Sequence, residues 1–193
     1  MTKDFTKKSK NLIKKLVNEK GLKLFTMKIC FGECTKFDLI AICDFLLANW
    51  LKMRRNRYSI FFKWFAGFTR ELIIEIDGDI CRPYLYLLLF ANNQNLPFLM
   101  ELKSLAFLSF VKTFKVTEEI CRGNVKVPLE EIAAEDYEKV IDDLMLPCIR
   151  VIKSNAELEE LLKNYQYNKQ LCSRGGIISR KNLERDVALD FER

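Results

Sequence analysis

Residues 51–83 read LKMRRNRYSIFFKWFAGFTRELIIEIDGDICRP, and two interpretations of this stretch lead to different folds. On a helix, one face would collect apolar residues three, four and seven positions apart: Met53, Ile60, Trp64 and Phe68. This spacing predicts a helix that continues to about Ile76 and is broken by Asp77 and Gly78. The alternative is a β-hairpin, because LIIEI and DICRP flank the same Asp-Gly pair. We follow the helical interpretation as the main expectation.

The same stretch mixes basic side chains with aromatic rings. The candidate phosphate-binding residues are Arg54, Arg55, Arg57 and Lys63. Arginines at the N-terminal end of a helix oppose its macrodipole, so we expect them to serve a partner or an acidic helix. The rings fall mostly on the core-facing side, which does not favour an exposed platform for base stacking. We therefore expect Trp50 and Trp64 to be largely buried.

The N-terminal segment predicts a basic amphipathic helix over residues 5–18. Its apolar stripe consists of Leu12, Ile13, Leu16 and Val17. Its lysines form a second candidate patch for nucleic acid: Lys7, Lys8, Lys14 and Lys15. Such a helix can lie on RNA, on DNA or on an anionic membrane, and a solvated helix end explains it equally well.

The rest of the first 148 residues predicts more helix than strand. The expected elements are a strand at 25–31, helices at 35–53, 83–92 and 97–116, and an acidic helix between Pro128 and Pro147. Thr35 and Asp38 are spaced as a capping pair at the start of the second helix. The helix at 35–53 is apolar on nearly every side, which is typical of a central core helix.

The last segment changes character. CIRVIK is strand-like, Ser154 and Glu157 form a capping box before a helix, and GGIIS predicts a short strand ahead of a terminal helix. The pair Gly175 and Gly176 fits a tight turn better than a phosphate cradle, because the phosphate-loop spacings are missing. The expected fold is mainly α: a helical bundle body at 1–148 and a small mixed α/β C-terminal module at 149–193.

Charge is distributed unevenly along the chain. Residues 1–28 hold nine lysines and two acids, whereas residues 129–160 hold ten acids and three basic residues. The net charge is +6. Such asymmetry favours a surface that meets phosphates or an acidic partner on one side. The alternative is two solvated faces without a partner.

Residue types limit the chemistry. The chain has no histidine, which excludes Ser-His-Asp and Cys-His catalysis and every histidine-containing metal site. Its seven cysteines are scattered, so we expect free thiols in a reducing compartment. A zinc site would need Cys30, Cys34 and Cys43, whose spacing is not the usual paired form. We expect no catalytic residue, metal or cofactor, and an enzyme using Cys, Lys, Asp or Glu is the alternative.

Two quoted stretches carry a family resemblance. MRRNRYSIFFKWFAGFTREL is similar to a helix of GINS replication-complex subunits, in which an arginine-rich R-x-R start precedes a run of leucines, tyrosines and basic residues. IRVIKSNAELEE and GGIISRKNLERDVAL resemble the small β-domain that closes some of those subunits, although KICFGEC and the missing last strand depart from it. The resemblance implies a non-catalytic scaffold in a four-subunit complex around a replicative helicase.

The sequence thus predicts a non-enzymatic scaffold protein associated with a nucleoprotein assembly through its basic N-terminal half. Two forms fit, a replication-complex subunit and a ribosome- or RNA-associated factor. The expected partners are protein subunits of that complex and, as a possibility, the phosphate backbone of DNA or RNA. The alternative is a helical protein–protein adaptor without nucleic-acid contact. No apolar run is long enough to span a bilayer, so we expect no membrane partner and a cytoplasmic or nuclear location.

Overall fold

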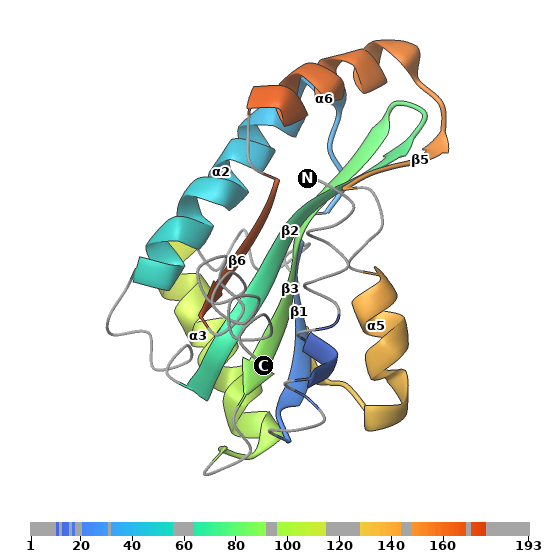
Figure 1. The fold of residues 1–193 in the computed structure, drawn as a ribbon. Coiled ribbons are helices and arrows are strands. Elements are labelled where there is room, and N and C mark those ends of the chain that lie inside the picture. The colour runs from blue at the N-terminus through green and yellow to red at the C-terminus, as the bar shows by residue number, and fades with distance from the viewer. Residues whose placement is uncertain are drawn as a thin grey trace, which may run out of the picture.

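A computed structural model shows a mixed β-sheet with helices on both faces (Figure 1). It describes residues 11, 13–15, 17, 21–30, 32–55, 64–91, 96–114, 128–143, 148–168 and 171–176. At 53–55, 111–114, 142–143, 167–168 and 174–176 the description covers the backbone alone. The N-terminal half of the expected first helix, the expected terminal helix after residue 180, and Cys121 lie outside these ranges.

A long hairpin forms the centre of the sheet. Strand β2 (Phe65–Asp77) pairs antiparallel with β3 (Ile80–Ala91) along its whole length. The turn between them contains Gly78 with a φ of 64°, a backbone conformation that suits glycine. The hairpin alternative is therefore confirmed, and the helices expected to continue to Ile76 and at 83–92 are wrong. Both strands are covered on both faces, so their apolar residues form runs without strand alternation.

The other strands extend this hairpin to either side. Next to β3 lies β1 (Lys23–Cys30), followed by the short β4 (Leu129–Glu131), both antiparallel to their neighbours. The far side of β2 is shared by two strands. β5 (Ile149–Lys153) runs parallel to its C-terminal end, and β6 (Cys172–Gly176) runs antiparallel to its N-terminal half. Within the described residues the sheet has six strands, in the order β4-β1-β3-β2-β5 with β6 on β2.

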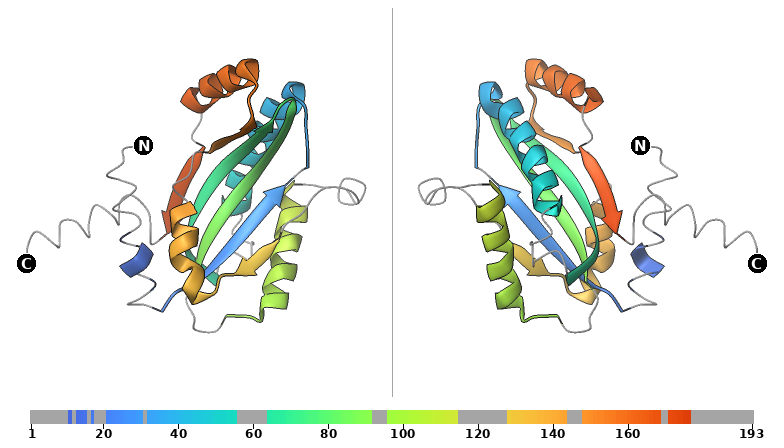
Figure 2. Two further views of the ribbon diagram at one scale, coloured as in Figure 1. Left: turned by 90° about the vertical axis from the view of Figure 1, so that its right-hand side faces the viewer. Right: turned by 90° about the vertical axis from the view of Figure 1, so that its left-hand side faces the viewer.

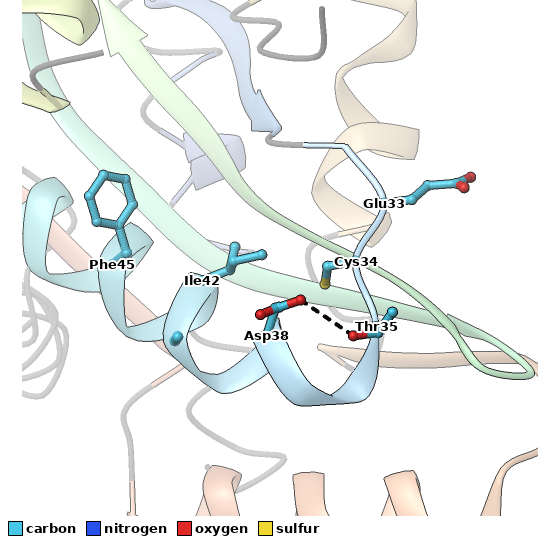
Figure 3. A pocket seen from close by; sticks show the side chains of 7 residues that line it. Glu33, Cys34, Thr35, Asp38, Ile42 and Phe45 are labelled. Carbon is cyan, nitrogen blue, oxygen red and sulfur yellow. Dashed lines mark hydrogen bonds between the residues drawn. The ribbon is translucent and has the colours of Figure 1, made fainter. Parts of the chain in front are cut away.

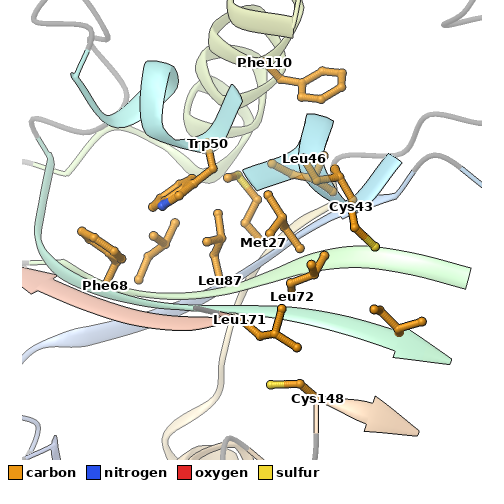
Figure 4. Close-up of a cluster of buried hydrophobic side chains, with 14 of the residues drawn as sticks. Met27, Cys43, Leu46, Trp50, Phe68, Leu72, Leu87, Phe110, Cys148 and Leu171 are labelled. Carbon is orange, nitrogen blue, oxygen red and sulfur yellow. The ribbon is translucent and has the colours of Figure 1, made fainter. Parts of the chain in front are cut away.

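Three helices cover one face of the sheet and enclose the larger core: α2 (Lys36–Arg55), α3 (Leu99–Phe114) and α6 (Ala156–Asn168). α2 buries a stripe at helical spacing, namely Leu39, Cys43, Leu46 and Trp50. These side chains pack on Phe68, Leu72 and Leu87 from the hairpin, with Phe110 of α3 beside them (Figure 4). Trp50 and Phe68 meet edge to face, with ring centroids 5.2 Å apart.

A second, smaller core lies on the opposite face. Ile13 and Val17, both in helical conformation, pack with Ile141 of α5 (Tyr137–Asp143) over Leu88 and Phe90 of β3. In the left view of Figure 2, α5 crosses in front of the strands while α2 passes behind them. The sheet is thus sandwiched between helices and contributes side chains to two cores.

The expected fold class is wrong. The chain is not a mainly α helical bundle, because a six-stranded mixed sheet lies between its helices. The acidic helix between Pro128 and Pro147 is also wrong: β4, a short turn of 3-10 helix at Ala134–Asp136 and α5 take its place. The strand at 25–31 and the helices at 35–53 and 97–116 are confirmed as β1, α2 and α3.

The C-terminal residues belong to the central sheet. The expected strand at CIRVIK and the helix after Ser154 are confirmed as β5 and α6, although Asn155 rather than Ser154 accepts the capping bond, from the Leu158 N–H at 3.1 Å. Gly175 and Gly176 are paired in β6, so the tight turn expected there is wrong. The boundary at residue 148 is not a boundary of the sheet, since β5 and β6 both bind β2.

Replacing Trp50 with Ala tests the larger core. Trp50 is 0% exposed, so we expect the free energy of unfolding to fall by about 3–5 kcal/mol in urea titrations. Phe37→Ala is the matched control on the same helix, because Phe37 is 84% exposed and its removal should change stability by about 0.5 kcal/mol or less. Equal losses in both variants would contradict this packing.

Truncation after residue 148 tests whether the last strands belong to the core. The shortened chain loses β5 and β6 from β2 and four buried side chains: Leu158, Leu162, Tyr165 and Leu171. We expect a lower melting temperature and a weaker near-ultraviolet circular dichroism signal than in the full chain. If residues 1–148 and 149–193 were independent units, the shortened chain would instead melt at the same temperature as the body of the full chain.

Candidate protein-interaction surface

An open pocket lies beside the first half of α2 (Figure 3). Its lining comes from the segment before the helix and from two turns of the helix: Glu33, Cys34, Thr35, Asp38, Ala41, Ile42 and Phe45. Two carboxylates therefore stand next to an apolar wall. The pocket can accept an apolar group together with a positively charged one.

Local hydrogen bonds fix the start of α2. The Thr35 carbonyl oxygen accepts from the N–H groups of Asp38 and Leu39, both at 3.2 Å. The Thr35 hydroxyl donates to the Asp38 carboxylate at 3.4 Å. The two residues of the expected capping pair are thus in contact at the first turn, but the bond joins their side chains and is not the side chain to backbone N–H bond of a capping box. A carboxylate at this position also suits the helix macrodipole.

The thiol in this pocket is held in its protonated form. Cys34 and Cys81 exchange two backbone N–H···O bonds of 2.9 Å, which fixes Cys34 beside β3. Burial raises the pKa of the Cys34 thiol to about 11, and the nearby Cys81 and Asp38 add to the shift. Burial also raises the pKa of Cys43, on the core side of α2. Because the thiolate is the nucleophile, neither group is prepared for cysteine catalysis at neutral pH.

Large apolar side chains project from the outward side of the helices. On α2, Phe37 is 84% exposed and lies one and two helical turns before Ala41 and Phe45, which are also exposed. Around α3, Phe98 and Met100 are 87% and 76% exposed, and the helix also exposes Phe107 and Leu108. Exposed apolar groups at this density are typical of surfaces that meet another protein.

Basic and acidic segments that are far apart in the sequence neutralise each other in space. The ion pairs join Lys14 to Glu138, Lys23 to Glu131, Lys36 to Glu157 and Arg82 to Glu33. Each exposed pair adds little to stability, but each also reduces the positive potential that a phosphate would meet. Part of the charge asymmetry along the sequence is therefore neutralised by ion pairs within the molecule.

Of the predicted nucleic-acid residues, the structure describes Lys14, Lys15, Arg54 and Arg55, which belong to helical segments on opposite faces of the sheet. Lys14 pairs with Glu138 and Lys15 is exposed beside it. The backbone of Arg54 and Arg55 forms the last turn of α2, so these residues are at a helix C-terminus, where positive charge suits the macrodipole, and not at an N-terminus as expected. Lys7, Lys8, Arg57 and Lys63 lie outside the described residues.

Two residues of the expected N-terminal apolar stripe are already covered. Ile13 is 2% exposed and Val17 is 9% exposed, both within the smaller core, and Leu12 and Leu16 lie outside the described residues. Ile13 and Val17 are therefore not available to insert into a membrane.

A polar network that the sequence does not predict lies on the face of the sheet opposite α2. The Tyr84 hydroxyl donates to Glu75 at 2.8 Å and accepts from Arg150 at 3.4 Å, and Lys28 Nζ lies 3.7 Å from the Tyr84 ring centroid. Burial, followed by the bond to Glu75, raises the pKa of Tyr84. The four residues come from β1, β2, β3 and β5, so only the strand register could have grouped them.

No family model, curated protein or solved structure matches the chain. The stretch that resembles a GINS helix is not one helix, since α2 ends at Arg55 and β2 begins at Phe65. Among the helices that the structure describes, none has the length and hydropathy needed to cross a membrane. Within the same residues, no group of three or more Cys, Asp or Glu side chains could hold a metal ion.

The raised pKa of Cys34 predicts a loss of stability in alkaline solution. The folded chain keeps this proton up to about pH 11, whereas the unfolded chain releases it at the ordinary thiol pKa, so the free energy of unfolding should fall between those values. Urea midpoints measured from about pH 8 to about pH 11 should fall less steeply in Cys34→Ser. Parallel pH profiles for the two proteins would contradict the assigned burial of Cys34.

Proposed function

We propose that this protein is a non-enzymatic binding protein that joins a larger assembly through the pocket of α2 and the phenyl ring of Phe37 beside it. The observation that carries the proposal is a phenyl ring 84% exposed on a well-anchored helix, next to a pocket with both carboxylates and apolar groups. Exposed aromatic rings of this kind act as anchors at protein interfaces. A partner segment with an apolar side chain and a nearby lysine or arginine would complement this surface.

The chemistry of the pocket supports binding rather than catalysis. The chain has no histidine that could act as a general base near neutral pH. The one thiol in the pocket has a pKa of about 11. Glu33 forms an ion pair with Arg82 at 2.8 Å, so Asp38 is the pocket carboxylate that a positively charged partner group would meet. These features suit recognition of a partner by shape and charge.

A nucleoprotein setting remains part of the proposal. α2 has the pocket near its N-terminal end and Arg54 and Arg55 at its C-terminal end, so one helix can join a protein contact to a phosphate contact. A subunit of a replication complex and a ribosome- or RNA-associated factor are the two forms proposed, in the cytoplasm or the nucleus. Three lysines form ion pairs with glutamates and so offer less positive charge to a phosphate. This favours the protein contact as the principal one.

Substitutions at exposed positions of α2 test the proposal. Phe37→Asp and Ala41→Arg change the surface without touching the buried stripe of the helix, so circular dichroism and the melting temperature should stay as in the native protein. Each variant is tagged and expressed in the native cell. We expect the amount of co-purifying protein subunits to be at least tenfold lower than with the native protein. Lys163→Asp on the exposed side of α6 is the control and should keep them.

A third variant distinguishes an assembly that contains nucleic acid from one that contains protein alone. Reversal of Arg54, Arg55 and Arg57 to Glu should release nucleic acid from the recovered assembly, in a salt-dependent way, while its protein subunits remain. Recovery of unchanged protein subunits with Phe37→Asp and Ala41→Arg would refute the proposed docking surface. If the amount of recovered nucleic acid is unchanged after the arginine reversal, these arginines do not contact nucleic acid. The protein would then be an adaptor that contacts proteins alone.

A further inference from the structure

Two cysteines meet where β5 and β6 approach each other along β2. The Ile74 N–H donates to the Cys148 carbonyl oxygen and the Leu72 N–H donates to the Leu171 carbonyl oxygen, both at 2.8 Å. Cys172 is the first residue of β6 and lies opposite Glu71. Backbone bonds to one strand therefore hold both cysteines in place from two directions.

The two sulfur atoms are in direct contact. Cys148 Sγ and Cys172 Sγ are 2.9 Å apart, and a disulfide bond is about 2.05 Å long. Closing that gap requires a movement of less than about 1 Å between two side chains that already point at each other. We propose that Cys148 and Cys172 form a reversible disulfide that fastens β5 to β6 across the side of β2.

A second cysteine pair gives a comparison for this site. Cys34 and Cys81 also lie opposite each other, as a hydrogen-bonded antiparallel pair whose contact is described through the backbone, whereas Cys148 and Cys172 are in contact through their sulfur atoms. Burial dominates the raised pKa of Cys34, whereas the contact with Cys172 is the largest cause of the raised pKa of Cys148. Cys34 therefore provides a matched control thiol.

Oxidation requires an acceptor for two electrons, and a small disulfide such as oxidised glutathione can supply it. Cys172 is the more exposed of the two and would react first: its thiolate attacks one glutathione sulfur and releases one glutathione. The Cys148 thiolate then attacks the Cys172 sulfur of the mixed disulfide and releases the second glutathione. Two S–H bonds are lost, one S–S bond forms in the protein, and one S–S bond of the oxidant becomes two thiols.

The bond would close a loop that contains α6. This helix is tied to α2 by the Tyr165 hydroxyl, which donates to Asp44 at 2.8 Å, and by the ion pair of Lys36 and Glu157 at 2.7 Å. A cross-link at the base of the loop restricts the unfolded chain and keeps α6 near its docking site. We expect the oxidised protein to melt about 5–10 °C above the reduced protein.

Peptide mapping of the full native chain is the decisive experiment. The reduced protein is equilibrated in buffers with rising ratios of oxidised to reduced glutathione, remaining thiols are blocked with a maleimide, and the chain is digested with trypsin. Cleavage after Lys139, Arg150, Lys169 and Arg174 places the two cysteines in separate peptides, 140–150 and 170–174. We expect these two peptides to be recovered joined, with the protein losing two of its seven reactive thiols.

Variants test the specificity of the bond. Cys34→Ser should form the joined peptide at the same glutathione ratio as the native chain, whereas Cys172→Ser should lose both the joined peptide and the rise in melting temperature. The proposal is refuted if the native chain gives separate 140–150 and 170–174 peptides under oxidising conditions, or if Cys148 joins other cysteines as often as it joins Cys172. Mapping of the native chain gives this answer even if a variant fails to fold.

Discussion

The pairing of β2 with β3 is the constraint on which the rest of the structure depends. This hairpin is continuous from Phe65 to Ala91 except for one irregularity near Gly67, and both of its faces are buried. Every other described strand pairs directly with one of its two members or, in the case of β4, through β1. Since strand residues alternate between faces, this register also assigns the hairpin side chains to one or the other face of the sheet, and thereby its buried apolar side chains to the two cores.

Sequence patterns predicted the elements that have one buried side. β1 alternates, and α2 combines a capping pair with apolar residues at helical spacing, so both were expected close to their observed bounds. From the sequence, the hairpin is the weaker of the two interpretations because residues 72–76, apart from Glu75, and residues 85–91 are apolar without a clear period. Such runs do not distinguish a doubly buried strand from a helix. The turn residues Asp77 and Gly78 are the local signal that favours the hairpin.

The site was less predictable than the fold. Exposure of Phe37 depends on which side of α2 meets the sheet, and an all-apolar helix does not indicate that side. The Cys148 and Cys172 contact depends on two strands that meet on β2 after an intervening helix. Likewise, the lysines of the N-terminal half were seen as a partner surface because the sequence separates them from the glutamates that they contact in space.

The shortness of β4 has a consequence for behaviour in concentrated solution. A sheet ends in unpaired N–H and C=O groups, and a long flat strand there acts as a template on which a second molecule can add its own strand. β4 offers only Leu129–Glu131, and two of its three residues are exposed glutamates. A second copy approaching along this side would meet the carboxylate of Glu130 and a template too short for stable pairing, while Glu131 is paired with Lys23. Among the described strands, β4 is the last one on this side of the sheet and is therefore a poor template for a strand from a second copy.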